Sequence, residues 1–337
     1  MEISAQIYGI YLRYISPEDI HVYSIDECFI DVAPYLHTYG KTPKEMAEML
    51  MKAVLSETGI CATAGVGTNM FLAKVALDIT AKHSPDNIGI LDQEEFRRSI
   101  WHHRPITDIW QVGRGIAKRL EKYGDYDLHG ITLLDEKLLY REFGINARYL
   151  IDHSHGIETC TIKDIQSYVP KSESLSHGQI LFEDYNFDDA LLIVKEMVDV
   201  LSLELVQKKL VGNNISLSVH YSKEIAPPTG GVRKIDEYTN SYKKLAAYFE
   251  KLYMQTTLRN MPIRKINIGI NGIESDSYTT VNLFISEQEV QRERKLQETV
   301  LAIKGKYGKN SMLKGMNFKK RSTARARNKT VGGHNGE

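Results

Sequence analysis

The sequence predicts an α+β fold in which two sets of strands and helices flank a helical middle part. Short β-branched runs alternate with helical apolar spacing over residues 1–91 and again over 169–275, whereas 92–168 show helical spacing with short connections. Residues 276–337 form a basic tail. Apolar residues make up 42% of the 337 residues and charged residues 26%, which is typical of a globular protein of two or three domains.

A helix followed by a hairpin is predicted at the start. Residues 2–15 carry apolar side chains at three- and four-residue spacing, and Pro17 ends that pattern. Two β-branched and aromatic runs, 21–25 and 29–32, are then separated by three residues. This spacing predicts a hairpin with acidic side chains at its tip.

A capped helix, a strand and a second helix follow the hairpin. Thr42-Pro-Lys-Glu45 combines an N-cap residue, a proline at the first helical position and a glutamate at the third, so a helix is expected from there to Gly59. A buried-type strand over 60–66 and a helix over 71–82 come next. The order α-β-β-α-β corresponds to a ferredoxin-like unit that lacks its opening strand.

The middle part contains a predicted helix–hairpin–helix. Residues 106–110 and 116–123 are the two limbs, and Gln111-Val-Gly-Arg-Gly115 connects them. A complete βαββαβ pattern then spans 173–273, with strands at 175–182, 215–221, 231–238 and 263–270 and a first helix that is capped near Asp188 and ended by Gly212.

Composition excludes several classes of protein. No stretch approaches about 18 consecutive apolar residues, so no membrane span is expected. Cys28, Cys61 and Cys160 lie far apart without metal-ligand spacing, which favours a reduced, cytoplasmic setting.

The zero net charge hides a gradient along the chain. Residues 1–225 hold 22 basic and 33 acidic side chains, whereas 226–337 hold 21 and 10. From Leu301 onward there are ten Lys or Arg and one acid. Such a segment is typical of contact with a phosphate backbone; the alternative is a solvated end without a partner.

Asp26 and Glu27 are the candidate chemical residues of the hairpin. At a tight bend two adjacent carboxylates can converge and hold Mg²⁺ together with substrate phosphates. The alternative is an ordinary solvated turn, which is common for this dipeptide.

Five ordered motifs resemble those of the Y-family translesion DNA polymerases, in particular the UmuC (ImpB/MucB/SamB) branch. They are Tyr23-Ser-Ile-Asp-Glu-Cys-Phe-Ile-Asp31, Gly65-Val-Gly-Thr-Asn-Met-Phe-Leu-Ala-Lys74 with Ala81-Lys82, Trp110-Gln-Val-Gly-Arg-Gly115, Ile263-Arg-Lys-Ile-Asn-Ile-Gly269, and the closing Gly308–Met312 and Arg327–His334. The resemblance extends over essentially the whole chain.

The resemblance implies a DNA-directed DNA polymerase built as a right hand. It assigns a partial palm to 1–91, a thumb to 92–168, a little finger to 169–275 and a basic tail to 276–337. It implies two Mg²⁺ ions, with Asp26 bridging them, Glu27 at the primer end and a third carboxylate from a first palm strand. The implied partners are primer–template DNA and a deoxynucleoside triphosphate.

The resemblance also assigns roles outside the hairpin. Lys82 would contact the triphosphate, although a solvated helix-end lysine is the alternative. Leu283 and Phe284 would bind a sliding clamp, yet Thr280 stands where that motif has glutamine. DNA phosphates would be contacted by the glycine hairpin and its neighbours, unless the glycines only form a helical corner: Gly113, Arg114, Gly115, Lys118 and Arg119.

The sequence departs from the family at its start, because the first palm strand and the fingers are not in it. We therefore expect impaired catalysis by this chain alone, as in a fragment, a start-codon truncation or the larger half of a split polymerase. A non-catalytic DNA-binding remnant is the alternative from another class. A nucleotide cyclase with a similar palm is disfavoured, since it would explain neither the helix–hairpin–helix nor the basic C-terminal half.

Overall fold

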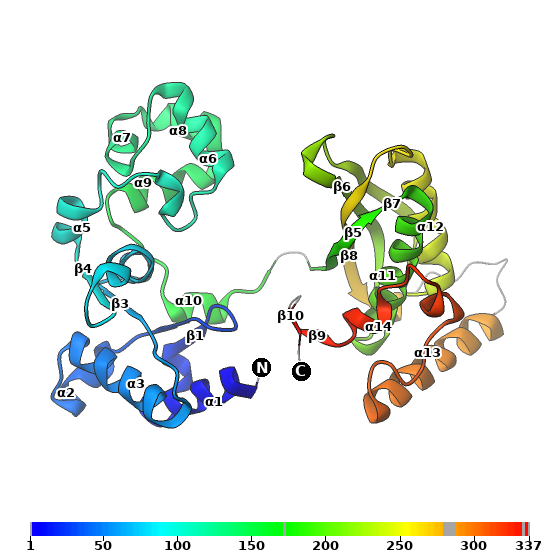
Figure 1. Cartoon of the computed structure of the whole chain (residues 1–337), viewed down its shortest axis with the longest axis horizontal. Coiled ribbons are helices and arrows are strands. Elements are labelled where there is room, and N and C mark those ends of the chain that lie inside the picture. The colour runs from blue at the N-terminus through cyan, green and yellow to red at the C-terminus, as the bar shows by residue number, and fades with distance from the viewer. Residues whose placement is uncertain (1, 171–172, 279–286, 332–333, 336–337) are drawn as a thin grey trace. The chain divides into compact units, whose positions relative to one another are not determined.

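The chain forms two units, Met1–Val169 and Pro170–Glu337, each with its own core. The computed structural model describes residues 2–170, 173–278, 287–331 and 334–335 (Figure 1). No helix among these residues is long and apolar enough to cross a membrane.

The first part of unit 1 contains two separate two-stranded sheets. β1 and β2 pair antiparallel, and β3 and β4 pair parallel. The elements are α1 (Glu2–Tyr11), β1 (Ile20–Val22), β2 (Cys28–Ile30), α2 (Leu36–Tyr39), α3 (Pro43–Thr58), β3 (Ala64–Gly67), α4 (Met70–Val75) and β4 (Ile88–Leu91).

The hairpin and the capped helix are confirmed. β1 and β2 pair with Val22 opposite Cys28, which puts Asp26 and Glu27 in the connecting turn. Thr42 and Glu45 make the reciprocal capping box of α3, and Gly59 ends that helix in the left-handed region at φ 71°.

The strand after α3 is shorter than predicted. Only Ala64–Gly67 is extended in the sheet, and its residues are half-buried rather than fully buried. A Cβ added to Gly65 would stand 2.1 Å from the Ala73 carbonyl oxygen, so α4 packs directly on the strand backbone. The prediction gave no element at β4, an apolar run that follows a turn.

The rest of unit 1 is helical, as predicted for this segment. Its helices are α5 (Gln93–Ser99), α6 (Arg114–Leu120), α7 (Leu128–Leu133), α8 (Glu136–Phe143), α9 (Ala147–Ser154) and α10 (Ile162–Ser167). The first limb of the predicted helix–hairpin–helix is wrong in length, because it is a single 3-10 turn, Ile106–Asp108. One hydrophobic core runs from Phe71 in α4 to Leu150 in α9.

Unit 2 is a four-stranded antiparallel sheet with the order β5-β8-β6-β7. The elements are β5 (Ser174–Tyr185), α11 (Phe187–Gln207), β6 (Leu210–Tyr221), β7 (Thr229–Thr239), α12 (Tyr242–Thr256) and β8 (Ile263–Ser275). The βαββαβ pattern is confirmed. Asn186 rather than Asp188 caps α11, and Gly212 lies inside β6, so the predicted helix end at Gly212 is wrong.

The basic C-terminal segment folds onto unit 2 as α13 (Glu287–Tyr307), a 3-10 turn (Gly315–Phe318) and α14 (Ala324–Arg327), followed by β9 (Thr330–Val331) and β10 (His334–Asn335) (Figure 1). Its anchor is Glu196 of α11, which is 1% exposed. That carboxylate accepts hydrogen bonds from Asn317 Nδ2 at 3.0 Å, from the Thr323 N–H at 3.1 Å and from the Ser322 hydroxyl. A buried carboxylate therefore fixes the segment.

We predict that Glu196→Ala destabilises unit 2 by about 3 kcal/mol, because three donors of the C-terminal segment lose their acceptor in a buried place. Urea unfolding of the full chain measures this change. Glu183→Ala is the control, since Glu183 pairs with Arg321 of the same segment at the exposed surface. It should cost less than about 1 kcal/mol. Equal effects of the two substitutions would contradict the prediction.

Candidate active site

The turn between β1 and β2 holds two carboxylates at one end of the hairpin. The N–H groups of Tyr23 and Ser24 donate to the Glu27 carbonyl oxygen at 3.0 and 3.1 Å, which closes the turn. The Ser24 hydroxyl donates to Asp26 Oδ1 at 2.6 Å. Asp26 is exposed and Glu27 is half-buried, so both carboxylates are reachable from solvent.

Lys74 of α4 connects the hairpin to the helix behind it. Its ammonium donates to Glu27 Oε1 at 2.8 Å and to Asp78 Oδ1 at 2.9 Å, and the residue is 8% exposed. Burial alone would lower the pKa of Lys74, but the hydrogen bonds to the two carboxylates outweigh burial and raise that pKa above its usual value. Lys74 is therefore a buried partner of both carboxylates.

An aromatic cluster, missed by the sequence analysis, fixes the base of the turn. Trp110 Nε1 donates to the Tyr23 hydroxyl at 3.0 Å, and the two rings meet edge to face with centroids 5.9 Å apart. Trp110 also lies 5.8 Å from the Phe29 ring. The signal that could have pointed to this contact is a large aromatic residue directly before the glycine hairpin.

A cavity of about 800 Å³ is lined by both β2 and β3, which do not pair with each other. Its wall is mostly apolar and includes Phe29, Ile30 and Val66, while Glu27 and Lys74 reach it from the hairpin side. Of the two candidate carboxylates, Glu27 thus borders the cavity between the two small sheets.

The donor set of the turn fits Mg²⁺. Two adjacent carboxylates at a rigid bend offer the hard oxygen ligands that this ion takes, together with substrate phosphates. Among the described residues, Asp26 and Glu27 have no third Asp, Glu, His or Cys with all ligand atoms within 4.8 Å of one another. Two of the three implied carboxylates are therefore present in this part of the chain.

Lys82 lies in a 3-10 turn, Ala81–His83, which follows α4 after a π-helical segment, Ala76–Thr80. It is exposed, and no ion pair involves it among the described residues. Lys82 is eight residues beyond Lys74, about 12 Å along a helix axis. Its contact with a triphosphate stays a prediction.

The two glycines at the start of α6, Gly113 at the N-cap and Gly115 in the first turn, are not required by packing. A Cβ at Gly113 or Gly115 would meet no atom within 4 Å. The residue with positive φ in this connection is Gln111, at 68°. The reading of Gly113 and Gly115 as a helical corner that needs glycine therefore lacks support, and both backbones are open to an approaching group.

The three basic residues of α6 have different surroundings. Arg114 and Lys118 are exposed at the start and middle of the helix. Arg119 instead donates from Nη1 to the Glu142 carbonyl oxygen at 2.7 Å and lies 4.4 Å from the Phe143 ring. Arg119 thus joins α6 to α8.

The sheet of unit 2 presents small polar side chains on the face opposite to its core. Along β6, buried Ile215, Leu217 and Val219 alternate with half-buried Asn214, Ser216 and Ser218. On the same face lie Lys265, Asn267 and His220, whose pKa is lowered by burial and by Lys265. The named positions of this face are polar or basic, and none of them carries an acidic side chain. Leu283 and Phe284, the predicted clamp contacts, lie outside the described residues.

Comparison with known proteins agrees with this arrangement. Residues 1–78 match the impB/mucB/samB family, and 172–283 match the C-terminal domain of the same family. A putative UV-damage repair protein, UvrX, of Bacillus subtilis is 27% identical over 99% of this chain and 78% of its own length. A DNA polymerase IV 2 of Halalkalibacterium halodurans is 27% identical over 98% and 79%.

Among solved structures, a Y-family DNA polymerase chimera of Dbh and Dpo4 has a TM-score of 0.58 at 20% identity, covering 81% of this chain and 75% of that one. This likeness supports the fold. The two family matches together extend over more than half of the chain and include the carboxylate hairpin. The chain therefore belongs to the impB/mucB/samB family of Y-family DNA polymerases, as its motifs predicted.

Proposed function

We propose that this chain is a DNA-directed DNA polymerase of the translesion type, which transfers a nucleotide onto a primer 3′-hydroxyl. The observation that carries this proposal is the β1–β2 turn, in which Asp26 and Glu27 stand together beside the protonated Lys74. The relatives named DNA polymerase IV and the family matches support the same activity.

Asp26 and Glu27 would hold two Mg²⁺ ions. When bound there, the metal supplies activation of the primer hydroxyl and neutralises charge on the triphosphate and on the leaving pyrophosphate. The turn hydrogen bonds from Tyr23 and Ser24 keep both carboxylates at one end of the hairpin, so little reorganisation is needed when the substrate binds.

The other residues of the chain position the substrates. Lys74 orients Glu27, because its ammonium is held between the carboxylates of Glu27 and Asp78. Lys82 offers a mobile positive charge for the triphosphate. The open backbone of Gly113 and Gly115, with Arg114 and Lys118 beside it, would bind DNA phosphates without reading sequence. Arg119 has a lesser part, because its guanidinium is engaged within the unit.

The polar face of the unit 2 sheet is a second proposed DNA surface. Its serine, asparagine and lysine side chains donate hydrogen bonds to phosphate oxygens, and the positions described on it carry no acidic group that would repel them. A sliding clamp is a further proposed partner through Leu283 and Phe284.

The relatives are bacterial, so we propose the cytoplasm, where their DNA lies, as the place of action.

A second candidate function is DNA binding without synthesis by the chain alone, or synthesis only with a complementary part. The specific observation in its favour is that Asp26 and Glu27 lack a third ligand among the described residues, and that Glu27 borders a cavity between unpaired β2 and β3. Primer extension decides between the two.

We expect Asp26→Asn to lower primer extension by the full chain with Mg²⁺ and all four nucleotides by about a thousandfold, since a lost metal ligand costs several kcal/mol in the transition state. Binding of the primer–template should stay within about twofold. Glu48→Gln on α3 is the control, because it removes one carboxylate of the same unit outside the hairpin.

Extension by Asp26→Asn at the wild-type rate would reject the proposed role of the turn. If the unmodified chain binds primer–template with steep salt dependence but does not extend it, the second candidate function is supported instead.

We predict that Gly115→Ala weakens primer–template binding several-fold without loss of stability. The helix has room for the methyl group and gains about 0.5–1 kcal/mol from the change, whereas the methyl group obstructs a phosphate at the exposed backbone. Fluorescence anisotropy and thermal unfolding measure the two effects. Gly9→Ala in α1 is the matched control, because Gly9 is also helical with nothing within 4 Å. Unchanged DNA affinity in Gly115→Ala would contradict a phosphate contact there.

A further inference from the structure

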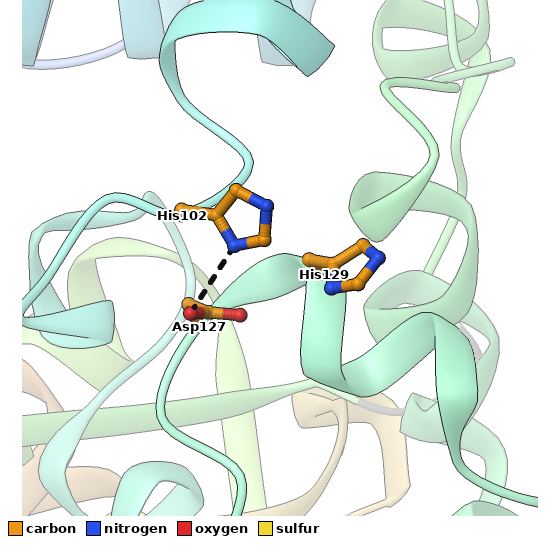
Figure 2. A group of neighbouring side chains, drawn as sticks. All are labelled: His102, Asp127 and His129. Carbon is orange, nitrogen blue, oxygen red and sulfur yellow. Dashed lines mark ion pairs between the residues drawn. The ribbon is translucent and has the colours of Figure 1, made fainter.

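Three side chains in the helical part of unit 1 form a cluster apart from the carboxylate hairpin. His102 lies in the segment after α5, Asp127 caps the N-terminus of α7, and His129 is the second residue of α7. One ligand atom from each lies within 4.8 Å of those of the other two, and Figure 2 shows the two imidazole rings and the carboxylate gathered where the loop enters the helix.

The spacing within the cluster suits shared ligation better than direct pairing. His102 Nδ1 and Asp127 Oδ2 lie 3.6 Å apart, which is within ion-pair distance (Figure 2) but longer than a hydrogen bond. Two atoms bound at about 2.0–2.1 Å to one tetrahedral ion are roughly 3.3 Å apart. The rings of His102 and His129 have centroids 4.7 Å apart at an interplanar angle of 56°, so they are not stacked.

Two members of the cluster are held firmly by their surroundings. The backbone N–H of His129 donates to the Trp101 carbonyl oxygen at 3.0 Å. The Trp101 and His129 rings also meet edge to face, with their centroids 4.9 Å apart. The Asp127 side chain is 7% exposed, and its Oδ1 accepts the Gly130 N–H at 3.0 Å. His102, with a side chain 67% exposed, is the adjustable member.

The charge on the other carboxylate oxygen of Asp127, Oδ2, is balanced by the exposed guanidinium of Arg104. Arg104 donates from Nη2 and Nε to Oδ2 at 2.8 and 3.2 Å, and its side chain is 62% exposed. Asp125, two residues before Asp127, is 5% exposed, and its Oδ2 has no hydrogen-bond partner among the described residues. The Asp127 oxygen Oδ2 is thus balanced by an exposed guanidinium, which an entering cation can replace.

We propose that His102, Asp127 and His129 bind a Zn²⁺ ion, with Arg104 displaced from Asp127 Oδ2 when the ion enters. Two imidazole nitrogens and one carboxylate oxygen are ligands that Zn²⁺ takes, with a fourth position left for water or a phosphate oxygen. Mg²⁺ is disfavoured because it prefers oxygen ligands in an octahedron. In the sequence, residues 106–123, which contain the glycine hairpin, lie between His102 and Asp127. A bound ion would therefore link the two ends of that segment.

The test is calorimetric titration of the chelator-treated full chain with Zn²⁺ in the presence of excess Mg²⁺, supported by Co²⁺ absorption spectra. We expect one Zn²⁺ per chain, a tetrahedral Co²⁺ spectrum and a thermal midpoint that rises with Zn²⁺. His102→Gln should weaken binding at least tenfold, and its exposed side chain makes a folding defect improbable on structural grounds. Arg104→Gln should strengthen binding, because a competing cation is removed.

Two controls locate the ion. His83→Gln removes an exposed histidine of the same unit outside the cluster and should leave Zn²⁺ binding unchanged. The double substitution of Asp26→Asn and Glu27→Gln should also leave it unchanged, which separates this site from the proposed polymerase site. Absence of saturable Zn²⁺ binding, or equal binding by the chain and by His102→Gln, would overturn the proposal.

Discussion

The buried ammonium of Lys74 is the interaction on which the candidate active site depends. An unpaired buried charge is costly, so Lys74 requires the carboxylates of Glu27 and Asp78 at hydrogen-bond distance. Glu27 is thereby held against α4, and the hairpin that carries it is oriented by the same contact. The Tyr23–Trp110 hydrogen bond then ties the hairpin to the segment before α6. The turn that carries Asp26 and Glu27 is consequently held by two side chains remote in sequence, Lys74 and Trp110.

Packing against α4 explains how the two small sheets of unit 1 are held in place although they do not pair with each other. α4 lies directly on β3, where a Cβ at Gly65 would clash with the helix backbone, and the core of α4 continues into the helical part. β1 and β2 are attached through Lys74 and through a smaller core around Met46. The cavity between β2 and β3 is thus bounded by elements that are anchored elsewhere.

In the C-terminal half, some charged side chains form contacts within unit 2, and others are exposed at its surface. Glu196 accepts hydrogen bonds from the 3-10 turn and from the start of α14, and Lys314 pairs with Asp199 at 2.7 Å. Part of the positive charge that the sequence places after Leu301 therefore stabilises unit 2. Lys309, Lys319 and Lys320 of the same segment are exposed, and these lysines, together with the polar face of the sheet, can face a polyanion. The basic side chains behind the gradient of net charge thus include some that stabilise unit 2 and some that are free to contact a polyanion.

The sequence by itself determined the features that depend on neighbours along the chain: the β1–β2 hairpin with Asp26 and Glu27 in its turn, the Thr42–Glu45 capping box, the βαββαβ order of unit 2 and the family. It misplaced the end of α11 at Gly212, because a glycine also fits a strand, and it overestimated the first limb of the helix–hairpin–helix. Only the tertiary structure decided the partners of Lys74, the role of Arg119 and the meeting of His102 with Asp127 and His129. The physical reason is that turns and caps are satisfied by hydrogen bonds within a few residues, whereas buried charges and ligand clusters are satisfied by groups that folding brings together from distant segments.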